Sequence, residues 1–283
     1  MAFAITMVYN ESLFLNRWID YYSKELGRDK LLIIDHGSND GSTNNLSGLN
    51  YLKLERTPFD DEARAAMIGN FVNGLLSYND CCIYSDCDEF LVPDPDIYEG
   101  LEHYCSSLKT EAAYAVGLDV RQLVGREPPI DLNLPFLGQR RYARLRMSMC
   151  KPLITKGQIR WNPGFHTSNK KPGFDKDLIL FHMKYVDLNA SLSRLAVTRA
   201  MSWSEVSIDK KRGAHQRETD EKMQGRFLND KKSFDAGPEK FDFQEEERLI
   251  NEGAYSDSKG NYIKGLEYNN KYVEIPERFF GIV

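Results

Sequence analysis

The chain has 283 residues, enough for one large α/β domain or for one domain with an appendage. With 41% hydrophobic and 28% charged residues, its composition is that of a soluble globular protein. A net charge of −5 argues against a general nucleic-acid-binding protein, which needs a basic stripe. It does not argue against a small anionic ligand, which needs only a local positive site. No apolar run of about 18 residues occurs, so we expect no transmembrane segment.

The cysteines and the amino-terminal residues indicate the compartment. The cysteine count is odd and the spacing follows no disulfide framework, which favours reduced thiols in the cytoplasm. The five are Cys81, Cys82, Cys87, Cys105 and Cys150. A zinc site at Cys81, Cys82 and Cys87 is a minor alternative, because the first two fall in an apolar strand. The opening residues are typical of a strand and not of a signal peptide. We expect a cytoplasmic protein, with peripheral association at the inner face of the membrane as an option.

The first 90 residues alternate between strand and helix patterns. Residues 3–8 predict a buried strand, and residues 15–26 predict a helix that Gly27 ends. Residues 31–34 form a continuous apolar run, typical of a strand covered on both faces. A second helix over about 62–77 and a strand over 81–85 follow. This alternation predicts a parallel sheet with covering helices.

Each of these three strands is followed by a polar cluster. The clusters are Asn10-Glu11, residues 35–42 and residues 86–89. Ligands of such sheets bind outside the carboxyl ends of the strands. If the strands are parallel, all three clusters converge at one edge.

The pattern loosens after residue 90. Residues 113–118 and 177–185 predict strands, residues 125–141 a loop, and residues 189–204 a helix. The stretch 205–248 is heavily charged, which predicts long exposed helices or partial disorder.

The acidic cluster suggests metal binding. Asp86 and Asp88 lie one residue apart at a strand end, where both carboxylates can reach a hard divalent cation if the chain turns. Mg²⁺ or Mn²⁺ prefers oxygen ligands and shares its coordination sphere with substrate phosphates. The plain alternative is a solvated acidic turn. The position after the third strand of a β-α-β series favours the metal.

The segments MVYNESLFLNRWIDYYSKELGRDKLLIIDHGSNDGS and IYSDCDEFLVP resemble the family-two-like bacterial glycosyltransferases of the Asp-x-Asp-Glu-Phe type. The resemblance covers about residues 3–93. It implies a GT-A type fold, which is a Rossmann-like, mostly parallel α/β sheet flanked by helices, here with a helical or irregular C-terminal extension. We therefore divide the chain into a transferase domain over residues 1–200 and a charged extension over residues 201–283.

The resemblance also implies residue roles. Glu11 matches the acidic residue that lines the nucleotide pocket, and Asp35 and Asp40 match acidic positions near the base and ribose. Asp86 and Asp88 match the metal-binding pair, with Asp88 the more direct ligand, and Glu89 matches a third acidic position that orients the sugar or a ligand. His36 departs from the pattern, because many relatives carry Asp there.

The second half offers weaker candidates. Relatives commonly have a Lys before a strand and a His after a Gly-aromatic pair, and Lys151 and His166 match this loosely. Lys151 is a candidate for diphosphate contact. His166 is either a metal ligand or an exposed loop histidine, and His182 is either a core or a site residue. The cluster from Arg140 to Arg146 has a solvated face as its default reading.

An inverting transferase needs a general base near the acceptor hydroxyl, usually a carboxylate. Asp119, Asp175 and Asp177 are possible, and we take Asp119 as a candidate catalytic residue with Asp88 and Glu89. No residue pattern decides between an inverting and a retaining mechanism.

The preferred hypothesis is a metal-dependent enzyme that moves a sugar from a nucleotide diphosphate sugar, with a UDP-sugar expected, to a hydroxyl of a glycan or glycoconjugate. Bacterial surface polysaccharide synthesis is the pathway that the resemblance implies. One alternative is a sugar nucleotidyltransferase, against which the first strand is followed by Asn10-Glu11 and not by a Gly-rich phosphate loop. The others are a non-catalytic carbohydrate-binding or scaffold protein and, more remotely, a metal-dependent phosphohydrolase.

Overall fold

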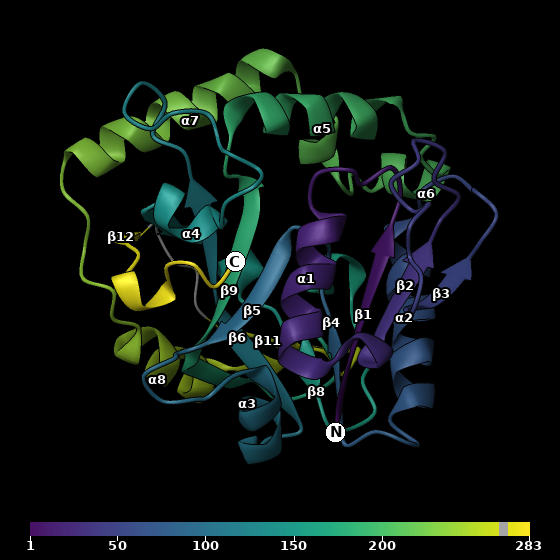
Figure 1. Ribbon diagram of the computed structural model, residues 1–283. Coiled ribbons are helices and arrows are strands. Elements are labelled where there is room, and N and C mark those ends of the chain that lie inside the picture. Colours follow the sequence, from purple (N-terminus) through teal and green to yellow (C-terminus); the bar gives the residue numbers. More distant parts are fainter. Residues whose placement is uncertain (266–270) are drawn as a thin grey trace.

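The computed structural model describes residues 1–265 and 271–283, which form a ten-stranded mixed sheet with helices packed around it and a separate two-stranded ribbon (Figure 1). The strands are β1 (Ala2–Val8), β2 (Leu31–Asp35), β3 (Asn50–Lys53), β4 (Cys81–Tyr84), β5 (Glu89–Pro93), β6 (Ala112–Arg121), β7 (Tyr142–Leu145), β8 (Ile154–Thr155), β9 (Gly173–Tyr185), β10 (Tyr255–Ser256), β11 (Tyr262–Ile263) and β12 (Tyr272–Glu274). The helices are α1 (Leu15–Leu26), α2 (Asp61–Leu75), α3 (Leu101–Ser107), α4 (Phe136–Gln139), α5 (Leu188–Ala200), α6 (Glu205–Asp209), α7 (Asp220–Asp235) and α8 (Gln244–Gly253). Short 3-10 helices are η1 (Arg28–Lys30), η2 (Met147–Met149), η3 (Pro163–Phe165), η4 (Ala214–Gln216) and η5 (Glu277–Phe279).

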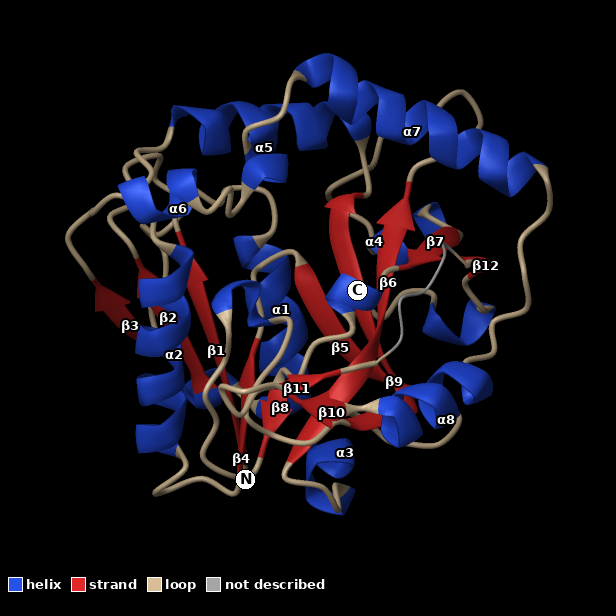
Figure 2. Ribbon diagram, turned by 180° about the vertical axis from the view of Figure 1, so that it is seen from behind, coloured by secondary structure: helices blue, strands red, loops and turns tan. Residues whose placement is uncertain are grey.

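The first half of the chain forms the parallel part of the sheet, in the order β3-β2-β1-β4. The chain moves one way along the sheet from β1 to β2 and the other way from β3 to β4. Because crossover connections between parallel strands are right-handed, this reversal places α1 and α2 on opposite faces of the sheet (Figure 2). The carboxyl ends of β1, β2 and β4 therefore meet at one edge.

Helix α1 packs on one face of the sheet and is hydrogen-bonded to the turn after β4. Trp18 is fully buried, and its indole N–H donates to the Ser85 hydroxyl at 2.8 Å. The helix ends at Gly27, whose φ of 96° disfavours side-chain-bearing residues. Helix α2 begins at Asp60, whose carboxylate accepts from the N–H groups of Glu62 and Ala63.

The second half completes a mixed sheet around β6, all ten residues of which are buried. Strand β6 pairs antiparallel with β7 and β8 and parallel with β9, and β5 pairs antiparallel with β9. In this register His182 of β9 lies between Glu89 of β5 and Asp119 of β6. The strand pairing alone therefore gathers three polar side chains.

Strand β6 passes very close to the segment that precedes Lys151. A Cβ atom added to Gly117 would lie 2.2 Å from the carbonyl carbon of Met149, a backbone atom that cannot rotate away. We expect Gly117→Ala to lower the free energy of unfolding by about 3 kcal/mol, the upper part of the overpacking range. Denaturant unfolding measures this.

The matched control is Gly74→Ala in α2, where a Cβ would meet nothing within 4 Å. The control should stabilise the protein slightly, by about 0.5 kcal/mol, and equal stability of the two variants would contradict the close approach.

Helices α5, α6 and α7 lie across the carboxyl ends of β1, β6 and β9, at the top of Figure 1. Helix α5 begins at Asp187, whose carboxylate accepts from the Ala190 N–H. Helix α7 packs against α5 and buries Met223, Phe227 and Phe234. We call residues 188–235 the cap, because they cover the edge of the sheet where the polar clusters gather.

The predicted α/β class is confirmed, with parallel core strands flanked by helices in a mixed sheet. The predicted elements over 3–8, 15–26, 31–34, 62–77, 81–85, 113–118, 177–185 and 189–204 correspond to β1, α1, β2, α2, β4, β6, β9 and α5. Several short elements had no prediction, among them β3, β5, β7 and β8. They are strands of two to five residues, too short for a periodic pattern.

Two expectations about irregular or exposed segments need correction. The predicted loop over 125–141 is mostly irregular but contains the four-residue α4. Arg140 of the arginine cluster is fully buried whereas Arg141 is exposed, so only part of the cluster is a solvated face. The charged stretch 205–248 contains helices as predicted, namely α6, α7 and part of α8, but they are not exposed all round, because α7 buries Met223, Phe227 and Phe234. The division at residue 200 stays a prediction; β12 pairs with β7 in the main sheet.

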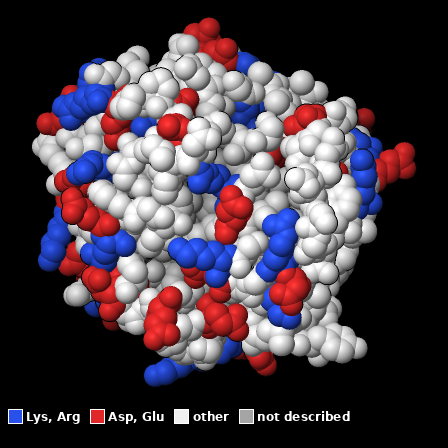
Figure 3. Space-filling model, in the orientation of Figure 1, with Lys and Arg blue, Asp and Glu red and all other residues white. Residues whose placement is uncertain are grey.

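Among the described residues, none of the helices has both the length and the apolar composition needed to cross a bilayer. On the face drawn in Figure 3, acidic and basic side chains are intermixed over the surface.

Candidate active site

A cavity of about 730 Å³ lies between the carboxyl edge of the sheet and the cap. Its walls come from β1 and the turn after β4, from β6 and β9, from the segment 146–166 and from α5 and α7. This volume is within the usual range for a small-molecule site. All three polar clusters expected at this edge contribute to the cavity wall, and residues 86–89 contribute more side chains than the other two.

The acidic cluster forms a tight turn between β4 and β5. The Glu89 N–H donates to the Asp86 carbonyl at 2.9 Å, so the chain reverses within four residues. The Met183 N–H donates to the Asp88 carbonyl at 2.7 Å and joins the turn to β9. The turn thereby places the Asp88 side chain beside His182.

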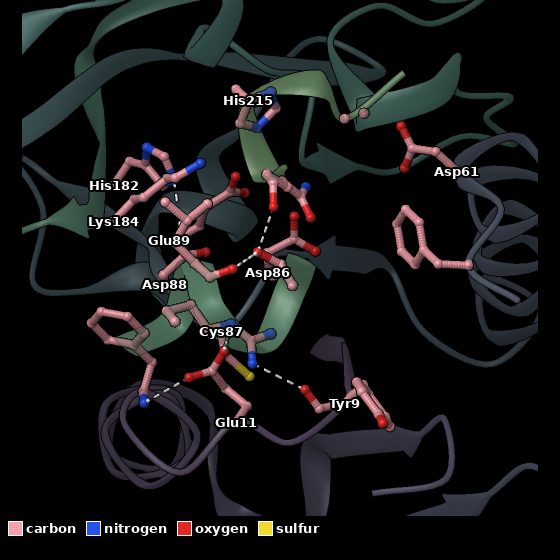
Figure 4. A pocket seen from close by; sticks show the side chains of 18 of the residues that line it. Tyr9, Glu11, Asp61, Asp86, Cys87, Asp88, Glu89, His182, Lys184 and His215 are labelled. Atoms are coloured by element: carbon pink, nitrogen blue, oxygen red, sulfur yellow. Dashed lines mark hydrogen bonds and ion pairs between the residues drawn. The ribbon is translucent and has the colours of Figure 1, made fainter. Parts of the chain in front are cut away.

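Asp88, Glu89 and His182 form the one group of three potential metal ligands found within residues 1–265 and 271–283 (Figure 4). Each offers one ligand atom, and these atoms lie within 4.8 Å of one another. His182 Nε2 is 3.3 Å from Asp88 Oδ2. Glu89 Oε2 is buried without a hydrogen-bond partner, which is unusual for a carboxylate oxygen. The oxygens and the imidazole nitrogen fit a divalent cation such as Mn²⁺.

The orientation of the His182 ring is set from behind by Asp119. Nδ1 of His182 donates to Asp119 Oδ1 at 2.6 Å, which directs Nε2 towards Asp88. Burial opposes protonation of the ring, but the two carboxylates outweigh it and raise the pKa of His182 to about 9. Both Asp119 oxygens are engaged, since Oδ2 accepts from Arg121 at 2.8 Å. This geometry favours an orienting role for Asp119 over the general-base role considered from the sequence.

Asp86 is bonded to Tyr84 and to Arg64 of α2, and not to His182. Its Oδ1 accepts from the Tyr84 hydroxyl at 2.7 Å and from Arg64 at 3.0 Å. Arg64 comes from α2 and also pairs with Asp61 at 3.0 Å. Asp86 lines the cavity but is not a member of the three-residue group.

Glu89 and Lys151 form a fully buried ion pair. Lys151 Nζ lies 2.5 Å from Glu89 Oε1. Burial raises the pKa of Glu89, and Lys151 opposes that shift. Lys151, expected to contact a diphosphate, therefore already has an internal partner next to the metal-ligand group.

His166 lines the cavity but does not join the metal-ligand group. Its ring Nδ1 lies 2.5 Å from the Ser148 carbonyl, to which Nδ1–H donates in the neutral ring. Burial, together with Lys151, lowers the pKa of His166 to about 3, so the ring is neutral near pH 7. The structure does not bring His166 and Asp86 into the cluster with Asp88, where the sequence had placed them; His182 is there instead.

The three candidate site residues near the amino terminus do not all lie at the cavity. Glu11 lines the cavity, where its Oε2 pairs with Arg194 of α5 at 3.1 Å and burial raises its pKa to about 7. Asp35 is fully buried beneath the turn and accepts from the Ser38 N–H at 2.7 Å and from two hydroxyl groups. Asp40 accepts from Ser42 in an exposed turn. Neither Asp35 nor Asp40 is part of the cavity wall.

Three residues near these turns, Tyr9, His36 and Arg56, are joined by side-chain contacts on the cavity wall. The Arg56 guanidinium carbon lies 3.7 Å from the centre of the Tyr9 ring. Arg56 also donates to His36 Nδ1 at 2.8 Å. Sequence reasoning found only His36, because Arg56 lies about 20 residues away in a segment without a distinctive motif.

Comparisons with known proteins are weak at the sequence level. No protein-family model matches the chain, and no curated protein matches it. A mannosyltransferase from Pyrobaculum calidifontis, in complex with GDP-Man and Mn²⁺, is 20% identical over 41% of this chain and 35% of its own, with a TM-score of 0.29. A mannose-1-phosphate geranyltransferase from Thermus thermophilus is 14% identical over 51% of this chain and 48% of its own, with a TM-score of 0.30.

Both structures are named as transferases. The chain spans about a third to a half of the length of each. At such TM-scores the likeness says nothing about the roles of individual residues.

The sequence missed several residues of the cavity wall, among them Lys184 and Arg194. Lys184 had a signal in the strand pattern. Lys184 follows His182 by two residues in β9, and side chains two apart share a face of a strand. Arg194 had none, because its contact with Glu11 joins residues 183 positions apart in the chain.

Proposed function

We propose that the chain is a divalent-cation-dependent glycosyltransferase that uses a nucleotide diphosphate sugar. The sugar would pass to a hydroxyl group of a glycan or glycoconjugate, in the synthesis of a bacterial surface polysaccharide. The observation that carries the proposal is the convergence of Asp88, Glu89 and His182 inside a ligand-sized cavity at the carboxyl ends of the strands.

Asp88, Glu89 and His182 are the residues that would hold Mn²⁺ or Mg²⁺. A bound cation at this place supplies charge neutralisation for a departing diphosphate. Asp119 would keep the His182 ring in place, and carboxylates that do this for a metal-bound histidine strengthen metal binding. Arg64 would keep Asp86 turned towards α2, where Asp86 can accept from hydroxyl groups of a ligand.

The charge of the cavity wall also supports an anionic ligand. The wall carries eight cationic side chains and six carboxylates, although the whole chain is acidic. The cationic residues are Arg56, Arg64, Arg146, Lys151, Lys184, Arg194, Arg212 and Arg226. Most have a carboxylate partner, so the excess positive charge is concentrated at the few that do not.

Lys184 is the cationic residue best placed to meet a diphosphate. It lies next to Asp88 and His182 in the cavity (Figure 4). Among the described residues, no carboxylate is within ion-pair distance of its Nζ, which lies 5.6 Å from the centre of the Tyr185 ring. Burial lowers the pKa of Lys184 to about 8, against the effect of Asp88 and Asp119. An arriving anion would give this partly buried ammonium group the partner that it lacks.

We expect Lys184→Met to weaken the binding of the preferred nucleoside diphosphate about tenfold or more, because a hydrogen bond to a charged group contributes about 1.5–3 kcal/mol. Calorimetric titration in the presence of Mn²⁺ measures this. Lys176→Met is the matched control, since Lys176 lies in the same strand, pairs with Asp177 and is not part of the cavity wall. Equal affinities of the two variants would remove Lys184 from the ligand site.

The proposal as a whole is tested by titrating the protein with UDP, GDP, CDP and dTDP, each with and without Mn²⁺. We expect one diphosphate to bind, and to bind more tightly with the cation. Absence of binding to all four would contradict the proposal and favour a scaffold protein. Release of pyrophosphate from a nucleoside triphosphate and a sugar phosphate would instead identify a sugar nucleotidyltransferase.

A further inference from the structure

A continuous array of buried charges runs from the cavity into the C-terminal part of the chain. It begins at His182, whose Nδ1 contacts Asp119 Oδ1 at 2.6 Å. Asp119 Oδ2 accepts from Arg121 Nη2 at 2.8 Å. Arg121 Nη1 in turn forms an ion pair with Asp230 Oδ2 at 2.8 Å. Asp119, Arg121 and Asp230 are 3%, 2% and 1% exposed.

The array joins elements that are far apart in the sequence. Asp119 and Arg121 are two residues apart on β6, so their side chains share a face of the strand. Asp230 comes from the middle of α7, which belongs to the cap. Its Oδ1 accepts from the Tyr272 hydroxyl of β12 at 3.3 Å. Asp230 is therefore held from a second direction by the last strand of the sheet.

The way in which Arg121 binds Asp119 depends on Asp230. A guanidinium group tends to bind one carboxylate with two nitrogens. Here its two terminal nitrogens are divided, so that Asp119 receives one and Asp230 the other. Asp119 thus keeps its second oxygen for His182. Without the charge of Asp230, Arg121 would be free to bind both oxygens of Asp119 and to compete with the ring nitrogen.

We propose that Asp230 is a positioning residue for the metal site, and that through Arg121 and Asp119 it fixes the orientation of the His182 ring. The inference rests on the proposed function, because the ring matters only if it binds the cation. It also assigns a role to the C-terminal stretch: α7 and β12 are part of the support of the site.

The experiment compares full-length Asp230→Asn with the wild type by two measurements. The first is the imidazole Nδ1–H proton of His182 in the metal-free protein, observed by NMR and identified as the resonance that His182→Gln removes. The second is the affinity for Mn²⁺. We expect the N–H resonance to move and its solvent exchange to accelerate. We expect Mn²⁺ affinity to fall about threefold to tenfold, at or below the lower end of the losses seen for residues that support metal ligands.

Asp235→Asn is the matched control. Asp235 lies on the same helix and pairs with Arg126 at the exposed surface, away from the array. The control should change neither measurement. A folded Asp230→Asn protein with the resonance and Mn²⁺ affinity of the wild type would overturn the proposal and leave α7 as a purely structural element.

Tyr272→Phe decides the question if Asp230→Asn does not fold. It removes one hydrogen bond to Asp230 and should move the N–H resonance in the same sense by a smaller amount; an unmoved resonance would overturn the proposal. If the wild type binds no Mn²⁺, the proposed function fails, and the N–H resonance still reports whether Asp230 acts on His182.

Discussion

Replacing Asp88 with alanine is expected to abolish Mn²⁺ binding and to lower any metal-dependent turnover about a thousandfold. The loss follows from electrostatics, because stabilisation of developing charge is often the largest contribution to catalysis. Asp88 is paired with His182, which belongs to the metal-ligand group itself, whereas Glu89 is paired with Lys151, which lies outside the group. Isothermal titration with Mn²⁺, followed by a transfer assay with the nucleotide sugar whose diphosphate binds, measures both effects.

The fold should survive this change. His182 keeps its bond to Asp119, so the substitution does not leave the His182 ring without a carboxylate partner. Glu245→Ala is a suitable control, because Glu245 is an exposed carboxylate of α8 that pairs with Arg248. Retention of cation-dependent binding by a folded Asp88→Ala protein would show that the metal site is elsewhere or absent.

Replacing Lys151 with methionine is expected to lower the free energy of unfolding by about 3–5 kcal/mol in the metal-free protein. Removing one partner of a buried ion pair leaves the other charge uncompensated in the interior. The remaining charge is Glu89, which has one oxygen already without a partner. Chemical denaturation of the two proteins in the presence of a chelator measures the difference.

The loss of unfolding free energy caused by Lys151→Met should depend on pH in a defined direction. Burial raises the pKa of Glu89, and loss of Lys151 removes the interaction that opposes this shift. A carboxyl group whose pKa is higher in the folded than in the unfolded state favours folding while it is protonated, and this contribution is lost as the pH rises through the folded-state pKa. The deficit should therefore be smaller near about pH 5 than near about pH 8.

The control for this prediction is Lys170→Met. Lys170 pairs with Glu111 at 3.1 Å, but Glu111 is 70% exposed. Exposed pairs contribute about 0–1 kcal/mol, so this variant should unfold almost as the wild type does. Equal losses of unfolding free energy in the two variants would contradict the desolvation of the Glu89–Lys151 pair that the structure indicates.

Sequence patterns were sufficient to predict helices and strands where the contacts are local or where the burial is continuous. The apolar spacing of α1 and the unbroken apolar runs of β2 and β4 indicated their elements to within a few residues. The convergence of polar clusters at the carboxyl edge followed from parallel pairing alone, because all such strands end at the same side of the sheet. Glu11, Asp88 and Glu89 were placed at the cavity by this reasoning.

Other parts of the site needed contacts between distant residues. Strand β5 turns back antiparallel along β9, and this pairing, not the Asp-x-Asp spacing, selects Glu89 and His182 as neighbours of Asp88. His166 looked equally suitable in the sequence, but its segment turns the ring towards the Ser148 carbonyl. Asp35 looked like a ligand contact, but its carboxylate accepts hydrogen bonds from Ser38, Thr43 and Tyr51 and is not part of the cavity wall.

The sequence by itself determined the α/β class, the order of the first elements and the edge of the sheet at which a ligand would bind. These depend on periodicity and on strand direction, which are properties of short segments. Only the tertiary structure decided which side chains meet at that edge, and that Asp230 of the C-terminal stretch pairs with Arg121. The physical reason is that a buried charge needs a partner. The partners of Asp119, Lys151 and Glu11 are His182, Glu89 and Arg194, which lie on elements that sequence spacing does not relate to them.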